Sequence, residues 1–213
     1  MAMFGPHTIQ EKKHHLELTE MLVNYHDSGA YKRDVDRVGQ KALDYLDTLP
    51  SDKPEQAIVL DLDETSWFNN WPAFINPETK GDPGKDAAWN EWVAKACAPA
   101  IPTSLELVTL ARKKDIEVFF ITGRYETAKA DTEKNLVNAG YQGWKDLYLY
   151  PKSADSDRSL VFPEAATYKT AVRWQITRSG YEIVLNMGDQ ESDITGGFAS
   201  KTFKLPNPFY TVI

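Results

Sequence analysis

Residues 57–65 read AIVLDLDET, a short run of branched apolar residues that leads directly into two aspartates. An apolar run of this length predicts a strand that is buried on both faces, as in a parallel sheet. Asp61 and Asp63 are two positions apart, so along an extended chain both side chains lie on the same side. Two carboxylates this close repel each other unless a cation or a shared proton compensates. The stretch therefore predicts a buried strand that ends in a site of negative charge.

The rest of the chain alternates between apolar runs and segments with helical periodicity. Strands that alternate with helices predict an α/β fold, in which a mostly parallel sheet lies between two layers of helices. The expected strands are residues 116–121, 147–150, 181–186 and 202–205, and the expected helices between them are residues 102–111, 127–138 and 167–180.

Residues that favour helix ends support this division of the chain. Thr167 is expected to cap the last long helix, and Gly180 is expected to end it. Two more helices are expected in the first fifty residues, because apolar residues recur at helical spacing on both sides of Asp27-Ser28-Gly29. The core of the fold therefore carries additional N-terminal helices.

Residues 66–101 interrupt this rhythm and contain four of the six tryptophans. We therefore divide the chain into a core of residues 1–65 and 102–213 and a small cap insertion of residues 66–101, with one helix expected at 87–96. An insertion after the first strand lies above the carboxyl end of the sheet, where open parallel sheets bind ligands. Its tryptophans form either the core of the insertion or a surface for a flat ligand.

Polar residues follow three of the expected strands. The first strand leads into Asp61, the second into Thr122-Gly123-Arg124, and the fourth into Gly188-Asp189 and then Asp193. Lys169 lies in the first turn of the helix before the fourth strand. Because parallel strands share one direction, these groups are expected to meet at one rim of the sheet. The hydroxyl and the backbone N–H groups that follow the second strand suit the oxygens of a phosphate.

Each of these features has a simpler interpretation when it is taken alone. An EF-hand calcium loop would require glycine at Ser66 and glutamate at Pro72, so that alternative fails. Thr65 could cap a helix, Gly188-Asp189 could form an ordinary turn, and Lys169 could be a solvated surface lysine. The prediction of one site depends on the joint pattern, in which each group is of the right type and follows the right strand.

The composition limits the partners of the chain. A formal net charge of −7 argues against a nucleic acid polymer or an anionic membrane as the main partner, since either needs a basic face. The net charge does not exclude a small anionic ligand, because such a ligand needs only a local basic pocket. Cys97 is the only cysteine, so an intramolecular disulfide is excluded. No apolar segment has the length of a membrane span or of a signal peptide.

The ordered set of polar groups resembles the haloacid dehalogenase (HAD) superfamily of phosphohydrolases. This resemblance implies a Rossmannoid three-layer sandwich with a cap. Four motifs carry it: Asp61-x-Asp63-x-Thr65 is similar to the first motif, Thr122 to the second, Lys169 to the third and Gly188-Asp189-x-x-x-Asp193 to the fourth.

The similarity is greater to the acid phosphatase branch, subfamily IIIB, which includes bacterial nonspecific acid phosphatases and plant vegetative storage proteins. It spans nearly the whole chain and rests on residues 25–31 (YHDSGAY), 188–190 (GDQ) and 203–208 (FKLPNP). Some storage members lack the nucleophilic aspartate, which is present here as Asp61. Glu191 departs from the pattern, because relatives often carry a tryptophan at this position.

The resemblance implies Mg²⁺-dependent hydrolysis of phosphate monoesters, with 5′-nucleotides as one substrate class. Asp61 would be the nucleophile that forms an aspartyl-phosphate, and Asp63 the general acid and base, in an environment that holds a proton at acidic working pH. The implied metal ligands are the Asp61 carboxylate, the Asp63 carbonyl oxygen, Asp189 and Asp193. The implied phosphate-binding residues are Leu62, Asp63, Thr122, Gly123 and Lys169. The residues expected to stack on a flat leaving group are Trp67, Trp71, Phe74 and Tyr125.

Two other functions stay open on the same fold. One is a non-catalytic storage or binding protein, and the other is a phosphotransferase in which an acceptor hydroxyl replaces water. A zinc hydrolase or a serine esterase is not indicated, because the sequence lacks both His-Glu-x-x-His and Gly-x-Ser-x-Gly. The resemblance implies a periplasmic or secreted protein, with a cytoplasmic one as the alternative, and it allows a homodimer.

Overall fold

The computed structural model describes residues 6–51, 53, 55–69, 87–151 and 164–211. The helices are α1 (Pro6–Asp27), α2 (Ala30–Thr48), α4 (Ala87–Lys95), α5 (Pro102–Lys113), α6 (Lys129–Asn138), α7 (Ala165–Arg178) and α8 (Glu191–Ile194), with a 3₁₀ turn η1 (Glu126–Ala128). The strands are β1 (Gln56–Leu60), β2 (Glu117–Tyr125), β3 (Asp146–Tyr150), β4 (Glu182–Gly188) and β5 (Thr202–Lys204).

The five strands form one parallel sheet in the order β3-β2-β1-β4-β5. The central strand is β1, which pairs with β2 on one side and β4 on the other. Every residue of β1 is buried, as its continuous apolar run predicts. The order reverses at β1, so its carboxyl end lies at the switch point where such sheets bind ligands. The predicted α/β fold is confirmed.

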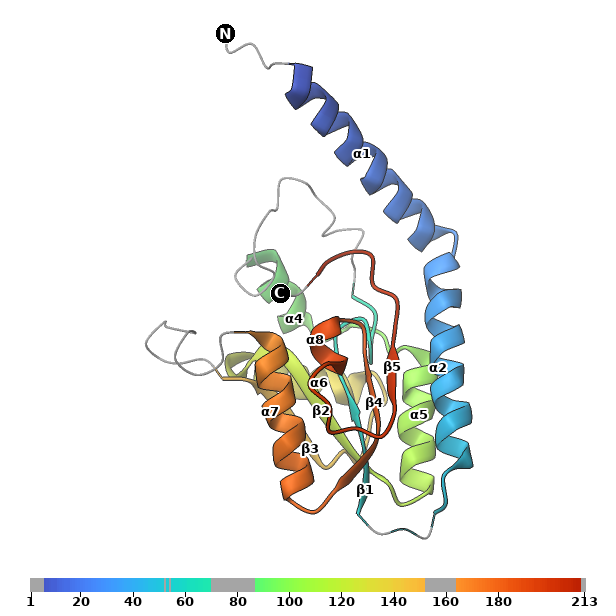
Figure 1. The fold of residues 1–213 in the computed structure, drawn as a ribbon. Coiled ribbons are helices and arrows are strands. Elements are labelled where there is room, and N and C mark those ends of the chain that lie inside the picture. Colours follow the sequence, from blue (N-terminus) through green and yellow to red (C-terminus); the bar gives the residue numbers. More distant parts are fainter. Residues whose placement is uncertain (1–5, 52, 54, 70–86, 152–163, 212–213) are drawn as a thin grey trace.

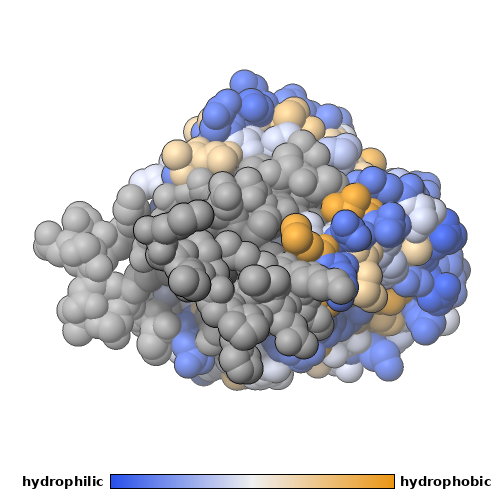
Figure 2. Space-filling model, turned by 90° about the horizontal axis from the view of Figure 1, so that it is seen from above, coloured by the Kyte–Doolittle hydropathy of each residue, from blue (hydrophilic) through white to orange (hydrophobic). Residues whose placement is uncertain are grey.

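Helices cover both faces of the sheet, and alternate residues of β1 point to opposite faces. Ile58 and Leu60 join a core cluster with residues of α2, α5 and α6, whereas Ala57 and Val59 join a second cluster with residues of α7. Figure 1 shows α2 and α5 on one side of the sheet and α7 on the other, while α1 extends away from the body. Seen from above, the described surface is mostly hydrophilic, with hydrophobic residues in small groups (Figure 2).

Two details differ from the sequence-based prediction. The second strand continues to Tyr125, so Thr122 and Gly123 lie within β2, where the pairing with β3 shifts in register after Ile121. Thr167 does not cap α7. The N-cap is Glu164, and the helix starts at Ala165 because Ala165 and Ala166 both favour helix. Gly180 follows α7 with φ 100°, as expected for a glycine at a helix end.

The contact between α2 and α5 depends on Gly39. A Cβ atom at this position would lie 2.2 Å from Thr103 Oγ1 and 2.6 Å from Thr103 Cβ. We expect Gly39→Ala to lower the free energy of unfolding by about 1–3 kcal/mol, because overpacking outweighs the better helix propensity of alanine. Urea unfolding measures this difference. The control Lys41→Ala, at an exposed position of α2, should stay within about 0.5 kcal/mol, and an unchanged midpoint for Gly39→Ala would contradict the prediction.

Candidate active site

Three buried carboxylates meet at the carboxyl ends of β1 and β4. Asp61 follows β1, and its N–H donates to Met187 O at 3.0 Å, so the pairing with β4 continues to Asp61. Asp189 follows β4, and Asp193 lies in α8. One oxygen from each of these carboxylates lies within 4.8 Å of the others, and all three residues are buried. The structure therefore brings together the residues that the sequence placed at three separate positions.

The side chain of Lys169 reaches this cluster from α7. Its Nζ donates to Asp61 Oδ1 at 2.5 Å and also to Asp193 Oδ1. Burial alone would lower the pKa of Lys169, but the charges of Asp193 and Asp61 outweigh burial and raise the pKa, so the lysine is a cation. The alternative of a solvated surface lysine is wrong, since the residue is buried.

The charge of the cluster is suited to a divalent cation. With all four groups ionised, three carboxylates (−3) and one ammonium (+1) give a formal net charge of −2 in a buried site. Burial raises the pKa of Asp61 well above its usual range, with Lys169 opposing this shift, and burial with the charge of Asp193 raises the pKa of Asp189 to about 6. A bound divalent ion would relieve this repulsion, and carboxylate oxygens are the ligands that Mg²⁺ prefers.

Gly188 permits the close approach of Asp193. A Cβ atom on this glycine would lie 2.1 Å from Asp193 Cβ, so a larger residue would displace the loop that carries both carboxylates. Gly188 is the last residue of β4, which makes the ordinary-turn interpretation of Gly188-Asp189 wrong.

Three side chains orient Asp189. Thr65 Oγ1 donates to Asp189 Oδ1 at 3.0 Å, and the side-chain amides of Gln190 and Asn207 donate to Oδ2 at 2.6 and 2.7 Å. Thr65 therefore has a role in the site and caps no helix. Asn207 belongs to residues 205–210, which we call the C-terminal strap.

The C-terminal strap is bound at both ends. The N–H of Leu205 donates to Gly188 O at 2.8 Å, and the hydroxyl of Tyr210 donates to Glu64 Oε2 at 2.9 Å. Between them, the ring of Phe209 packs edge-on against Tyr31 of α2, with centroids 4.8 Å apart. Sequence reasoning did not assign a role to Asn207 or Tyr210, because their partners lie 18 and 146 residues away.

The carboxylate of Asp63 is not part of the three-carboxylate cluster. It accepts two hydrogen bonds from Arg124, at 2.7 and 2.9 Å, and one each from Trp67 Nε1 and Asn69 Nδ2. Burial works in the opposite direction, but the charge and hydrogen bonds of Arg124 outweigh it and lower the pKa of Asp63. The contacts with Arg124 thus favour the ionised form of Asp63, whereas the acid role implied by the resemblance needs a proton on this carboxyl at acidic pH and stays a prediction.

Among the groups predicted to bind phosphate, Leu62 and Asp63 follow the end of β1, and Thr122 and Gly123 lie in β2, its neighbour in the sheet. The last pair of residues between these strands is Leu60 with Phe120. Thr122 is buried, and its Oγ1 accepts the N–H of Arg124 at 3.1 Å. Gly123 is exposed, with no atom within 4 Å of the position that a Cβ would take. Among the described residues, this space beside the backbone of β2 is open and leaves room for a phosphate.

The predicted stacking residues are placed differently from one another. Trp67 is fully buried and donates its indole N–H to Asp63, so it offers no ring face to a substrate, which corrects the expected stacking role. Tyr125 is half-buried at the end of β2, with its ring edge-on to Tyr150. Trp71 and Phe74 lie outside the described residues.

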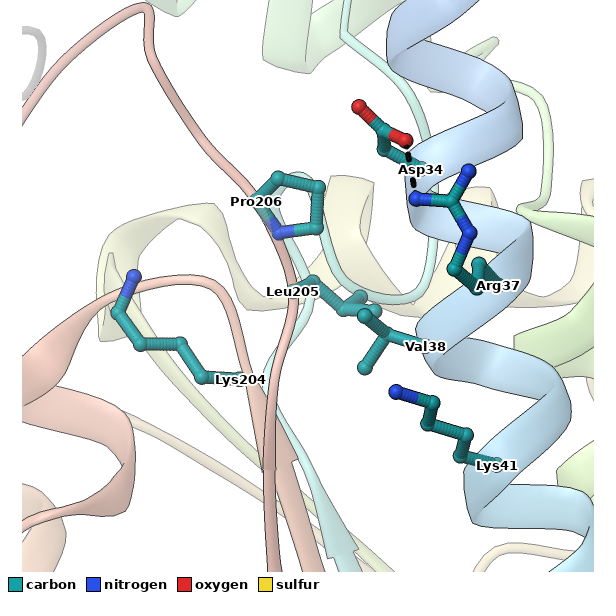
Figure 3. A pocket seen from close by; sticks show the side chains of 7 residues that line it. All are labelled: Asp34, Arg37, Val38, Lys41, Lys204, Leu205 and Pro206. Atoms are coloured by element: carbon teal, nitrogen blue, oxygen red, sulfur yellow. Dashed lines mark hydrogen bonds and ion pairs between the residues drawn. The ribbon is translucent and has the colours of Figure 1, made fainter.

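A hollow of about 400 Å³ lies away from this cluster, between α2 and the residues that follow β5 (Figure 3). Lys41 and Lys204 approach it from opposite sides, and Arg37 is paired with Asp34 at 2.7 Å. None of the residues that line it belongs to the carboxylate cluster, so it is not the candidate active site. The lining consists of Asp34, Arg37, Val38, Lys41, Lys204, Leu205 and Pro206.

Comparison with known proteins identifies the family of the chain. The model of the HAD superfamily, subfamily IIIB (Acid phosphatase), matches residues 5–213. The chain belongs to this family of acid phosphatases. The acid phosphatase sequence is similar to "Stem 28 kDa glycoprotein" of Glycine max, at 34% identity over 99% of this chain and 79% of the relative. It is also similar to "Acid phosphatase 1" of Solanum lycopersicum, at 33% identity over 92% of this chain and 75% of the relative.

A solved structure supports the fold of this acid phosphatase. The class C acid phosphatase from Bacillus anthracis superposes with a TM-score of 0.70, covering 93% of this chain and 85% of that one at 24% identity. The expected membership of subfamily IIIB and the expected phosphomonoesterase activity are thus confirmed. None of the helices in the described part of the chain combines the length and apolar character needed to cross a membrane.

Proposed function

We propose that this acid phosphatase is Mg²⁺-dependent and hydrolyses phosphate monoesters through an aspartyl-phosphate on Asp61. The observation that carries the proposal is the buried contact between Lys169 Nζ and Asp61 Oδ1, 2.5 Å apart, beside two further carboxylates. Burying one lysine together with three carboxylates costs stability. A structural or storage role would not need such a cluster. Their conjunction at the end of the central strand supports catalysis.

The chain's own residues divide the work of the reaction. Asp61 attacks the phosphorus, and the bond from phosphorus to the leaving oxygen breaks as the aspartyl-phosphate forms. Asp63 takes up a proton from solvent at acidic pH and passes it to the leaving oxygen; as the carboxylate, it then removes a proton from the water that releases phosphate. Its ionised state in the structure is the form needed for the second step. Thr122, Lys169 and the N–H groups of Leu62 and Gly123 hold the phosphate oxygens.

The metal is assigned to Asp61, Asp189 and Asp193, with the carbonyl oxygen of Asp63. When bound, Mg²⁺ neutralises charge on the phosphate and on the attacking carboxylate, so that two anions can approach. Asn207, Gln190 and Thr65 orient Asp189 toward this role.

Removal of the metal is the direct test of this proposal. We expect chelation with EDTA to reduce phosphate release from para-nitrophenyl phosphate to background, and added Mg²⁺ to restore it. Mg²⁺ should also raise the melting temperature of the protein, since it binds the folded state and relieves the net charge of −2. Full turnover after exhaustive chelation would contradict the assignment of a metal-dependent mechanism.

The same preparation distinguishes the two rival functions and tests the substrate class. Phosphate transferred to an added alcohol or nucleoside, in place of free phosphate, would identify a phosphotransferase. Absence of turnover from pH 4 to 8 in a folded, metal-loaded protein would favour storage or binding. We propose 5′-nucleotides as substrates because the resemblance implies them and because Tyr125, half-buried at the end of β2, is an aromatic residue that could stack on a nucleobase. A comparison of kcat/KM for nucleotides and sugar phosphates tests this.

A further inference from the structure

We infer that Asn69 is a positioning residue for Asp63, and that Trp92 of the cap helix α4 sets its orientation. The inference rests on the proposed function, in which Asp63 exchanges a proton with the leaving group. Asn69 is buried near the start of the cap insertion. No motif in the surrounding sequence indicates a function for Asn69. Its importance comes from the four hydrogen bonds that it makes with Asp63, Glu64 and Trp92.

The two oxygens of Asp63 have unequal surroundings. Oδ1 accepts hydrogen bonds from Trp67 Nε1 (2.9 Å), Asn69 Nδ2 (3.0 Å) and Arg124 Nη2 (2.7 Å). Oδ2 accepts one from Arg124 Nε (2.9 Å), the single donor to it among the described residues. The three donors occupy both lone pairs of Oδ1. Oδ2 accepts only one hydrogen bond from the described residues, so one of its lone pairs stays available to a substrate or to water. Asn69 therefore helps to decide which oxygen of Asp63 is available for chemistry.

The amide of Asn69 can take only one orientation in this network. Trp92 Nε1 donates to Asn69 Oδ1 at 2.8 Å, and an indole N–H has no acceptor function. The NH₂ group must then point the other way, where it donates to Asp63 Oδ1 and to Glu64 Oε2 at 3.1 Å. A flipped amide would place its oxygen against two carboxylates and its NH₂ against the indole N–H. Trp92 thus fixes the amide that contacts Asp63.

The other attachments of Asn69 are rigid. Its backbone N–H donates to Glu64 Oε1 at 2.9 Å, and Glu64 is fully buried and held on its second oxygen by Tyr210. Helix α4 also contacts Arg124, which donates two hydrogen bonds to Asp63. The ring centroid of Trp89 in α4 lies 5.5 Å from the guanidinium carbon of Arg124. A change in the position of α4 is therefore transmitted to Asp63 through Asn69 and through Arg124. Through these contacts, α4 sets the position of Asp63 for proton transfer to the leaving group.

Leaving groups of different basicity separate positioning from general structural support. An alkyl phosphate needs a proton on its leaving oxygen, whereas nitrophenolate leaves readily without one. We expect Trp92→Phe, which keeps an aromatic ring but removes the N–H, to lower the single-turnover rate of leaving-group release from an alkyl phosphate about tenfold. For para-nitrophenyl phosphate, this rate should fall less than about twofold, with KM for both substrates unchanged. Asn69→Leu should show the same selectivity with a larger loss, on the order of 10²-fold.

Controls separate the possible results. Trp174→Phe, on the exposed side of α7, should change neither substrate. Calorimetric Mg²⁺ affinity and the melting temperature should be close to those of the native protein in Trp92→Phe. An equal loss on both substrates, or no loss on either, would overturn the inference.

A double-mutant cycle tests the coupling to Asp63. In single turnovers, Asp63→Asn alone should selectively slow the release of the leaving group from alkyl phosphates, and Trp92→Phe should add nothing in that background. Additive effects on this step would overturn the positioning role while leaving the proposed function intact. Equal slowing of leaving-group release from both substrates in Asp63→Asn itself would instead show that the proposed acid assignment is wrong.

Discussion

Asp61→Asn is expected to reduce phosphate release by at least about 10⁴-fold, because an amide has almost the same shape as the carboxylate but is no nucleophile. Lys169 Nζ can still donate to the side-chain oxygen at position 61. The substitution also lowers the net charge of the buried cluster from −2 to −1, so the protein without metal should be at least as stable as the native one. Loss of activity will therefore not reflect unfolding.

Two measurements check this result. Phosphate release gives the rate, and acid quenching after incubation with ³²P-labelled substrate shows whether a covalent phosphoenzyme forms in the native protein and is absent from the variant. Asp115→Asn is a matched control, since Asp115 is exposed and asparagine tolerates its φ of 60°. Turnover at the native rate by Asp61→Asn would mean that another residue is the nucleophile.

Lys169→Met should have the second largest effect, on both activity and stability. Without the ammonium, Asp61, Asp189 and Asp193 carry a net charge of −3 in a buried site. We expect a loss of about 10³-fold in kcat, and in the absence of metal a loss of about 3–5 kcal/mol in the free energy of unfolding. Added Mg²⁺ should recover part of the stability but not the activity. Lys134→Met, exposed on α6, is the control for removal of one lysine.

The destabilisation of Lys169→Met should depend on pH in a defined direction. Burial raises the pKa of Asp189 in the folded state to about 6, above its value of roughly 4 in an unfolded chain. A carboxyl with a raised folded pKa favours folding while it is protonated, and this contribution is lost as the pH rises through the folded pKa. Urea unfolding of the metal-free variant should therefore show that the free energy of unfolding decreases from about pH 4 to about pH 6. The decrease should extend somewhat above pH 6, because the variant lacks Lys169, which lowers the pKa of Asp189. A variant that became more stable over this range would contradict the account.

Much of the fold follows from local pattern. The continuous apolar run before Asp61 indicates a strand buried on both faces, and β1 is central in the sheet. The order of strands and helices places Asp61, Asp189 and Lys169 at one rim, because parallel strands share a direction. The order and direction of the strands alone bring these three residues together, so their proximity could be predicted from the sequence.

The orientation of Asp63 could not be predicted in the same way. A spacing of two puts side chains on one side only while the chain stays extended, and β1 ends at Leu60, with Glu64 in the left-handed region at φ 56°. The turn directs Asp63 to Arg124, 61 residues further on. Contacts such as this, or Asn69 with Trp92, depend on side-chain rotamers and on distant segments. Neither periodicity nor spacing carries a signal for them.

The C-terminal strap has a consequence for how the protein is made. A nascent chain leaves the ribosome with Asp61 and Glu64 well before Asn207 and Tyr210, which orient Asp189 and hold Glu64. The central strand can pair with β2 while β4 is still being synthesised, but Asp189 lacks its last partner until the strap has emerged. The hydrogen bonds that orient Asp189 are therefore completed only after the strap has been synthesised, and a nascent chain that stops before Asn207 would contain Asp61 and Asp189 without this last contact.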